Sequence, residues 1–219
     1  NSAFPFPLFL GTGPSGPQAM RNFSVGDFDF ALPPELVAQH PAEERSASRL
    51  LDGTGPDPEH PVDRIFRDLP TLLREGDLLV FNDTRVVKAR LYGEKPTGGK
   101  VELLVERVLA GREVVAHVKV SKKPPVGTTL QMAGGFGATL LGRWPTEEGP
   151  LFRFELSDEP YGLMEAHGHV PLPPYITHAD GAEDERRYQT VFARNPGAVA
   201  APTAALHFDE GVLAGLRER

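Results

Sequence analysis

The chain contains no cysteine among its 219 residues. It therefore forms no disulfide, offers no thiolate to a metal ion and has no cysteine nucleophile. It also lacks an apolar run of the roughly 20 residues that a membrane-spanning helix needs, so we expect no membrane association. Positive charge is scarce as well, because 23 Lys and Arg stand against 30 Asp and Glu, a net charge of −7. An acidic protein of this kind needs a local basic patch if it is to bind nucleic acid.

The first 19 residues carry no charged side chain and are rich in Pro and Gly. A secretory signal would need a basic start and an uninterrupted apolar core, and both are missing. A glycine pattern of the dinucleotide-binding type occurs here, but Pro14 and Pro17 flank the point where its helix should open, which argues against that site. We expect residues 1–19 to be a disordered leader and Met20 to be the natural start.

Six apolar or alternating runs follow one another between about residues 86 and 156, and no helix-length pattern interrupts them. Turn residues separate the runs, so the runs must pair with one another as antiparallel strands. Closing six short strands into a small barrel removes exposed edges. The predicted strands cover residues 87–92, 101–108, 113–120, 128–132, 138–144 and 151–156.

Helical patterns and one further strand flank this β-rich stretch. A short helix is predicted over residues 34–39, with proline in its first turn, and an amphipathic one over residues 63–73. Residues 78–81 are four apolar residues between turn signals, which predicts a buried strand. Helical residues resume at 161–167, and the charged run 180–187 reads as a solvated helix start.

These patterns predict an α/β domain, incomplete in this chain, that is interrupted by an inserted six-stranded antiparallel β-barrel. The α/β domain is expected to comprise residues 20–85 and 158–219, and the inserted barrel residues 86–157.

A low-bulk stretch near the end of the chain favours a pocket. Pro196 and Pro202 fix the backbone, Gly197 lets it turn, and small alanines allow a close approach. A packed core would fill this volume with larger apolar side chains, whereas convergent polar groups suit a binding site. A surface connection whose alanines have no role is the alternative. The polar residues gathered here are Tyr188, Gln189, Thr190, Thr203 and His207.

Two other polar or stiff segments are candidates for the same site. The run 82–85 follows the predicted strand 78–81, at the end where open α/β sheets place ligand groups. A turn in which Asn82 or Asp83 bonds nearby backbone amides is the alternative. The proline-rich segment 171–175 reads as an internal strut or a pocket wall. The histidines around it lack carboxylates at ligand spacing, so we expect no metal.

Four blocks of sequence carry a family resemblance. They are Gly76-Asp-Leu-Leu-Val-Phe-Asn-Asp-Thr-Arg-Val-Val-Lys-Ala-Arg-Leu-Tyr-Gly93, Gly98-Gly-Lys-Val-Glu-Leu-Leu104, Gly168-His-Val-Pro-Leu-Pro-Pro-Tyr-Ile176, and Tyr188-Gln-Thr-Val-Phe-Ala with Pro196-Gly-Ala-Val-Ala-Ala-Pro-Thr-Ala-Ala-Leu-His-Phe208. In this order they resemble the S-adenosylmethionine:tRNA ribosyltransferase-isomerases of queuosine biosynthesis. The sequence departs from that pattern at Lys88, where the family usually has Pro, and at Ala205, where it usually has Gly.

The resemblance implies an architecture and a reaction. The architecture is a larger α/β domain interrupted by a six-stranded barrel. The reaction moves the ribosyl part of S-adenosylmethionine onto an aminomethyl-deazaguanine at the tRNA wobble position, which gives epoxyqueuosine and releases adenine and methionine. The family continues well past Arg219, so the chain resembles an N-terminal portion, and we expect it to be inactive alone. The expected setting is the cytoplasm, and the expected state is a monomer.

Such a reaction needs a base, donors for the departing adenine and a slot for an extruded nucleobase. His207 or Tyr188 is the hypothetical proton carrier, and Asp83 is assigned to the catalytic group with them. S-adenosylmethionine enters as the ribosyl donor, and because the chain has no cysteine, radical chemistry on a cysteine-ligated cluster is excluded for these residues. The residues assigned to substrate binding are Asn82, Arg85, Arg90, Gln189, Thr190, Pro202 and Thr203.

Transfer RNA is the expected macromolecular partner, and its basic patch is sought on the barrel. Lys119, Lys122 and Lys123 are the candidates, although three lysines on an exposed loop are often plain solvation. Two further alternatives stay open. The chain could be a non-catalytic fragment or RNA-binding module of the same fold, or a family member with a changed substrate, to which Lys88 points.

Overall fold

The computed structural model describes residues 22–57 and 59–218. The chain divides into two units, residues 1–37 and 38–219, and each is described by itself. In the first unit the described residues form two 3-10 turns, η1 (Val25–Phe28) and η2 (Pro34–Leu36). The helix predicted for residues 34–39 is wrong beyond this single turn, because Val37 already has an extended backbone. The leader predicted for residues 1–19 lies outside the described residues.

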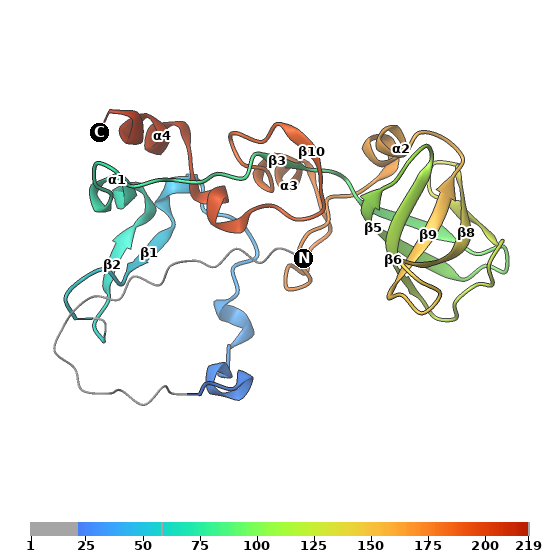
Figure 1. Ribbon diagram of the computed structural model, residues 1–219, viewed down its shortest axis with the longest axis horizontal. Helices are drawn as coiled ribbons and strands as arrows, with labels where there is room; N and C mark the ends of the chain where they lie inside the picture. Colours follow the sequence, from blue (N-terminus) through green and yellow to red (C-terminus); the bar gives the residue numbers. More distant parts are fainter. Residues whose placement is uncertain (1–21, 58, 219) are drawn as a thin grey trace. The chain divides into compact units, whose positions relative to one another are not determined.

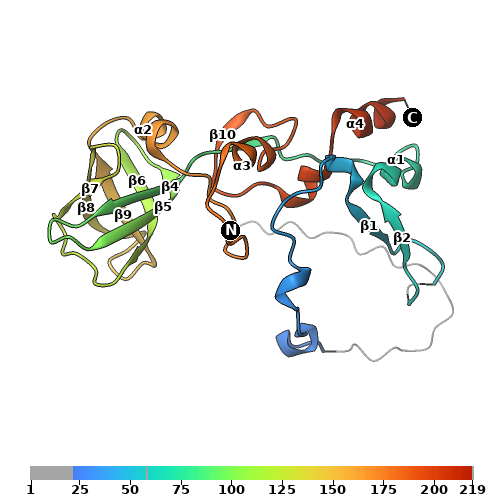
Figure 2. The same cartoon turned by 180° about the vertical axis from the view of Figure 1, so that it is seen from behind.

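Six antiparallel strands close into a barrel in the second unit, in the order β4-β5-β6-β9-β8-β7 (Figures 1 and 2). This confirms the predicted barrel, and each predicted strand has a counterpart within three residues at either end. Alternation explains the agreement, since every second side chain points to the interior. The strands are β4 (Arg90–Glu94), β5 (Lys100–Val108), β6 (Glu113–Val120), β7 (Thr129–Met132), β8 (Gly137–Trp144) and β9 (Leu151–Leu156).

The barrel encloses the main hydrophobic core of the described chain. Leu103, Ala116 and Phe154 are fully buried there. Helix α2 (Pro160–His167) follows the last strand and covers one end of the barrel, because Met164 belongs to the same core cluster. The His167 ring also stacks on Phe136, which lies in the β7–β8 turn, with 5.7 Å between ring centroids. One end of the barrel is thus closed by a helix.

A β-hairpin opens the rest of the second unit. Strand β1 (Arg49–Asp52) pairs antiparallel with β2 (Val62–Ile65), and only the short helix α1 (Leu69–Leu72) follows the 3-10 turn η4 (Phe66–Asp68). The amphipathic helix predicted over residues 63–73 is therefore wrong in its first half. Apolar residues at helical spacing are present there, but antiparallel pairing with the neighbouring strand β1 overrides that local pattern.

A parallel pair of short strands links two distant parts of the sequence. Strand β3 (Thr84–Val86) pairs with β10 (Asn195–Ala198), with a bulge at Gly197, whose φ of 139° suits glycine. The predicted buried strand 78–81 is wrong. Leu78 and Val80 are each 86 % exposed, and no strand of the described residues pairs with this run. An apolar run becomes a buried strand only where another strand is available to pair with it.

Three helical elements follow α2 in the described chain. They are the 3-10 turn η5 (Thr203–His207) and the helices α3 (Ala182–Arg187) and α4 (Glu210–Arg217). Asp209 caps α4 by accepting a hydrogen bond from the Val212 amide at 2.9 Å. A small second core unites Phe66, Phe208 and Val212. The 3-10 turn η3 (Arg45–Ala47) precedes β1. The predicted helices at 161–167 and in the charged run 180–187 are confirmed.

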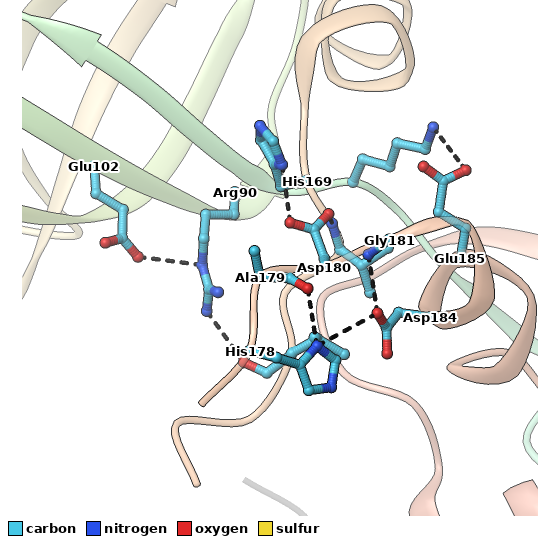
Figure 3. Close-up of polar contacts among 12 residues, drawn as sticks. Arg90, Glu102, His169, His178, Ala179, Asp180, Gly181, Asp184 and Glu185 are labelled. Carbon is cyan, nitrogen blue, oxygen red and sulfur yellow. Dashed lines mark hydrogen bonds and ion pairs between the residues drawn. The ribbon is translucent and has the colours of Figure 1, made fainter. Parts of the chain in front are cut away.

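The chain segments that lead into and out of the barrel lie side by side. Arg90 and His169 exchange two backbone hydrogen bonds, of 3.2 and 2.9 Å. Asp180 holds the outgoing segment, because its carboxylate accepts from the Val170 amide and contacts His169 Nδ1, both at 2.9 Å (Figure 3). A side chain at Gly168 would collide with the Lys88 carbonyl, so glycine is required at the end of α2.

Lys88, one of the two departures from the family pattern, ties this junction together. Its ammonium lies 3.1 Å from Glu185 on α3 and 3.5 Å from Glu165 on α2. Burial alone would lower the pKa of Lys88, but the hydrogen bond to Glu185 and the two negative charges outweigh it and raise the pKa. Lys88 is therefore a charged cross-link between the start of the barrel and two helices.

Candidate functional site

A cleft of about 280 Å³ brings one early segment of the chain together with three segments from residues 172–207. They are Ala38–Pro41, the proline-rich loop Leu172–His178, the end of α3 from Asp184 to Tyr188, and η5. Three predicted site residues, Tyr188, Thr203 and His207, line it together. A larger hollow of about 470 Å³ lies along the seam of β4 and β7, but none of the predicted residues line it.

Tyr188 comes into the cleft directly after α3. Burial raises the pKa of its phenol most, the nearby Tyr175 adds to this, and a hydrogen bond with the Ala201 backbone opposes it. Because the net shift is upward from 10.0, the phenol is protonated at neutral pH. Tyr188 is thus suited to donate a hydrogen bond rather than to accept a proton as a phenolate.

His207 ends η5, and its ring rests on Phe66 with 5.4 Å between centroids. This half-buried position fixes the imidazole against the second core while it lines the cleft. Thr203, at the other end of the same turn, is exposed and holds only a long contact of 3.4 Å to the Ala201 carbonyl. Its hydroxyl is therefore available to a ligand.

The loop that was predicted as a pocket wall does form one side of the cleft. Gln39 holds it in place, donating to the Tyr175 carbonyl at 3.0 Å and accepting from the Thr177 amide at 2.8 Å. His178 fixes the same loop from the other side: its ring stacks on His40 with 4.9 Å between centroids. Tyr175 is 55 % exposed at this wall and presents an aromatic surface.

The neighbours of His178 favour its protonated form (Figure 3). Its two ring nitrogens face carbonyl oxygens, Ala179 at 2.8 Å and Gln39 at 3.0 Å. A carbonyl can only accept, so both nitrogens are satisfied when both carry a proton. The Ala179 bond is the largest cause that raises the pKa of His178; burial opposes it, and the Gln39 bond and the charge of Asp184 support it.

Two arginines brace the base of the cleft through backbone carbonyls. Arg45 donates to the Arg187 and Leu206 carbonyls at 3.2 and 3.0 Å. Arg187 in turn donates to the carbonyls of Glu43 and Ala42, at 3.0 and 2.6 Å. These bonds join η3, α3 and η5 into one hydrogen-bonded frame at the base of the cleft.

The predicted residues near β3 lie away from this cleft. Asn82 accepts from the Thr84 amide at 2.9 Å, which is the turn that we considered as the alternative. The Asp83 carboxylate accepts from Asn195 Nδ2 and borders an apolar groove of about 330 Å³ beside α4. The Arg85 side chain is exposed and forms no hydrogen bond or ion pair with the described residues.

The remaining predicted binding residues have structural partners or are enclosed. Gln189 accepts from the Val86 amide at 2.9 Å and donates to the Val86 carbonyl at 2.7 Å, so it extends the β3 ladder. Arg90 donates to the Leu172 carbonyl at 3.1 Å, and its Nε lies 3.2 Å from Glu102 (Figure 3). Thr190 is 6 % exposed, and its hydroxyl has no hydrogen-bond partner within residues 22–57 and 59–218. Pro202 precedes η5, beside Thr203.

Sequence reasoning missed the cleft residues that come from outside the low-bulk stretch. These are Gln39, His40, Asp184 and Arg187. No local signal marks them, because each is placed by a contact more than 100 residues away or by helix α3. The one available hint was a histidine beside a helix-breaking proline at His40 and Pro41.

The three candidate lysines lie on the barrel. Lys119 is on β6, 87 % exposed and 3.9 Å from Glu102. Lys122 and Lys123 follow that strand, and Lys123 lies over the Phe152 ring at 5.1 Å. Residues 22–57 and 59–218 contain no cluster of three metal-ligating side chains. In the same residues no helix is both long and apolar enough to span a bilayer.

An α/β body that carries a polar cleft and an antiparallel barrel defines the class of architecture, and comparison with known proteins gives the family. Residues 25–219 match the family model described as "Queuosine biosynthesis protein". The chain belongs to this family.

Curated relatives agree with this assignment. Proteins named S-adenosylmethionine:tRNA ribosyltransferase-isomerase from Burkholderia pseudomallei (strain 1106a) and Dechloromonas aromatica (strain RCB) are 54 % identical over 199 and 198 residues, 90 % of this chain. The alignments cover 54 % and 55 % of those proteins, so the chain spans about half the length of the curated relatives it matches. A crystal structure titled S-adenosylmethionine tRNA ribosyltransferase, from Thermotoga maritima, is 29 % identical and covers 88 % of this chain and 54 % of that one, with a TM-score of 0.34.

Proposed function

We propose that these residues form part of an S-adenosylmethionine:tRNA ribosyltransferase-isomerase. The enzyme would transfer the ribosyl group of S-adenosylmethionine to an aminomethyl-deazaguanine at the tRNA wobble position and produce epoxyqueuosine. The observation that carries the proposal is the meeting of Tyr188, Thr203 and His207 in one cleft, since all three belong to the sequence block that bears the family signature. Both S-adenosylmethionine and tRNA are substrates, and the expected setting is the cytoplasm.

The cleft groups divide the proton chemistry between them. His207 is the proposed base, because an imidazole takes up a proton near neutral pH and this one is held by Phe66 at the cleft wall. Tyr188 keeps its proton and is the proposed donor to the departing adenine. Thr203 and the exposed Tyr175 ring offer a hydroxyl and a stacking surface for the two nucleobases that the reaction involves.

The residues near β3 and the barrel take supporting parts in the proposal. Asp83, oriented by Asn195, stays in the proposed catalytic group, and Asn82 and Arg85 stay in the proposed substrate-binding group. Gln189, Arg90, Thr190 and Pro202 are proposed to act by positioning. The proposed contacts with tRNA are made by Lys119, Lys122 and Lys123.

The test uses the complete coding sequence that contains these residues. The purified product is incubated with S-adenosylmethionine and tRNA that carries the aminomethyl-deazaguanine, and the nucleosides are analysed by mass spectrometry. We expect epoxyqueuosine together with equimolar free adenine. Binding of S-adenosylmethionine without either product contradicts the proposal and favours a changed substrate.

A second candidate function, RNA binding without turnover, is favoured by one observation. Residues 86–157 carry 11 Lys and Arg against seven Glu and no Asp, a net charge of +4 in a chain of net charge −7. A module of this kind would bind tRNA and release no adenine. The nucleoside assay separates the two functions, because only the transferase consumes S-adenosylmethionine.

A further inference from the structure

The two ends of the barrel differ in what covers them. The end that holds the β7–β8 turn is closed by α2 through Met164 and His167. Because the strands run alternately up and down, the opposite end holds the β4–β5 turn, the β6–β7 connection and the β8–β9 turn. We call this opposite end the distal rim, defined by residues 95–100, 121–128 and 143–150.

Basic side chains gather on the distal rim. Glu94, Glu147 and Glu148 are the carboxylates in or beside these turns. Among the described residues, no carboxylate lies within 4.0 Å of any of the rim cations. Three arginines outside these turns differ, since Arg90, Arg112 and Arg153 lie 3.2, 2.9 and 3.6 Å from glutamates. The rim cations are Lys95, Lys100, Lys122, Lys123 and Arg143.

Aromatic rings and short bonds hold part of this set in place. The Arg143 guanidinium lies over the Phe152 ring at 4.4 Å, and Lys123 lies over the same ring at 5.1 Å. Arg143 also donates to the Gly149 carbonyl at 2.9 Å, and Lys95 donates to the Lys122 carbonyl at 3.2 Å, so the three turns are fixed near the rim. Cations fixed in this way lose less conformational entropy on binding a polyanion.

Charge is segregated along the chain as well. Residues 86–157 have a net charge of +4, whereas the rest of the chain has 12 Lys and Arg against 23 Asp and Glu, a net charge of −11. A polyanion is repelled by most of the chain and attracted by the barrel. An RNA stem presents a regular line of phosphates, and the barrel is the part of the chain whose net charge is complementary to them.

We propose that the distal rim binds the phosphate backbone of RNA, outside the nucleotide that reacts. The inference rests on the proposed function, in which tRNA is the substrate, and it assigns the docking of the tRNA stem to the end of the barrel opposite α2. Phosphate contacts of this type position an RNA without reading its sequence. The rim therefore supplies affinity and orientation, and recognition of the base stays with the cleft.

The experiment measures binding of the 219-residue chain to a fluorescently labelled, unmodified tRNA transcript by anisotropy at several salt concentrations. The rim variant is K123Q/R143Q, which keeps long polar side chains and removes two charges. The matched control is R112Q/R153Q, which removes two charges of the same barrel that lie beside glutamates and outside the rim residues. Folding of each variant is checked by the fluorescence of Trp144, the single tryptophan.

We expect the rim variant to bind tRNA at least about tenfold more weakly, with the slope of log Kd against log salt reduced by about one to two, as for two lost phosphate contacts. The control should stay within about twofold, because its charges are already neutralised by glutamates. Equal losses in both variants would overturn the assignment to the rim, as would the absence of tRNA binding by the unsubstituted chain. Poly-glutamate and phosphatidylserine vesicles replace tRNA in parallel measurements. If the rim variant loses binding to either of these but keeps its affinity for tRNA, the assignment of tRNA docking to the rim is also overturned.

Failure of the rim can be told apart from failure of the proposed function. If the complete protein forms epoxyqueuosine and the rim variant keeps its tRNA affinity, only the proposed docking surface is refuted. If the rim variant binds tRNA selectively more weakly but the complete protein forms no product, the proposed transferase function is refuted and the docking surface is supported.

Discussion

The barrel and the α/β body are built on different balances of local and distant contacts. Every barrel strand pairs with neighbours that close the ring, and the interior holds a continuous cluster that includes the fully buried Phe154. The body joins β3 to β10 across more than 100 residues, and its second core is the small group Phe66, Phe208 and Val212. In a closed ring every strand has a partner on both sides, so no edge is left unpaired. In the body, by contrast, the apolar run 78–81 has no partner strand among the described residues and is exposed. The comparison teaches that the barrel is the stable part and the body is the adaptable part.

The largest expected effect separates the two cores. Phe154→Ala removes a fully buried ring and should lower the free energy of unfolding of the barrel by about 3–5 kcal/mol. Trp144 lies on β8 and is the single tryptophan, so its fluorescence during urea unfolding reports the barrel.

Phe66→Ala is the matched substitution in the body. It should leave the Trp144 transition nearly unchanged, because Phe66 belongs to the second cluster. A shift of the Trp144 midpoint as large as that of Phe154→Ala would mean that the two regions unfold as one, and the comparison would be broken.

A smaller effect is expected where the body holds the start of the barrel. Gln189→Ala removes both hydrogen bonds to the Val86 backbone and leaves a buried amide and carbonyl without partners, at a cost of about 1–3 kcal/mol. Hydrogen exchange of the Val86 amide should accelerate accordingly. Gln131→Ala, at an exposed position of β7, is the control and should leave that amide unaffected.

The smallest expected effect is a dependence on pH that belongs to the body. The pKa of His178 is raised above its ordinary value of 6.5, so its stabilisation of the cleft loop is complete below that value and is lost as the pH rises through the raised pKa. The groups that face it are the Ala179 and Gln39 carbonyls, Asp184 and the stacked His40 ring.

The Thr177 amide, which donates to Gln39, reports this loop. Its protection factor should fall across that pH range, after correction for the intrinsic exchange rate, and His178→Ala should abolish the dependence. A protection factor that rises with pH would contradict the claim that protonated His178 stabilises the cleft loop.

The barrel could be predicted from sequence because its information is local. Gly- and Pro-containing turns separate alternating runs, and consecutive runs pair, as β5 and β6 do. The predicted bounds of β6 and β9 match the structure. The body could not be predicted in the same way, because the strand that pairs with residues 84–86 lies more than 100 residues away, and a local pattern does not identify a distant partner.

The candidate site shows the same division. Tyr188, Thr203 and His207 of the low-bulk stretch line one cleft, whereas Gln189 and Thr190 of the same stretch do not, and the roles of all five stay predictions. His40 and Asp184 escaped prediction, since only the folded chain places them beside that segment. Gln189 has the same polar character as the cleft residues, but its side chain is used on the β3 backbone, which composition cannot reveal.

The most direct test of this account compares two histidines in the complete protein, one from each region. His207→Ala removes the proposed base from the cleft, and His117→Ala removes an exposed imidazole from the barrel wall. Initial rates of epoxyqueuosine formation are measured by nucleoside mass spectrometry at saturating S-adenosylmethionine and tRNA. The account predicts a loss of about a hundredfold or more for His207→Ala and a rate within about twofold of the unsubstituted protein for His117→Ala. Equal rates for the two variants would contradict it.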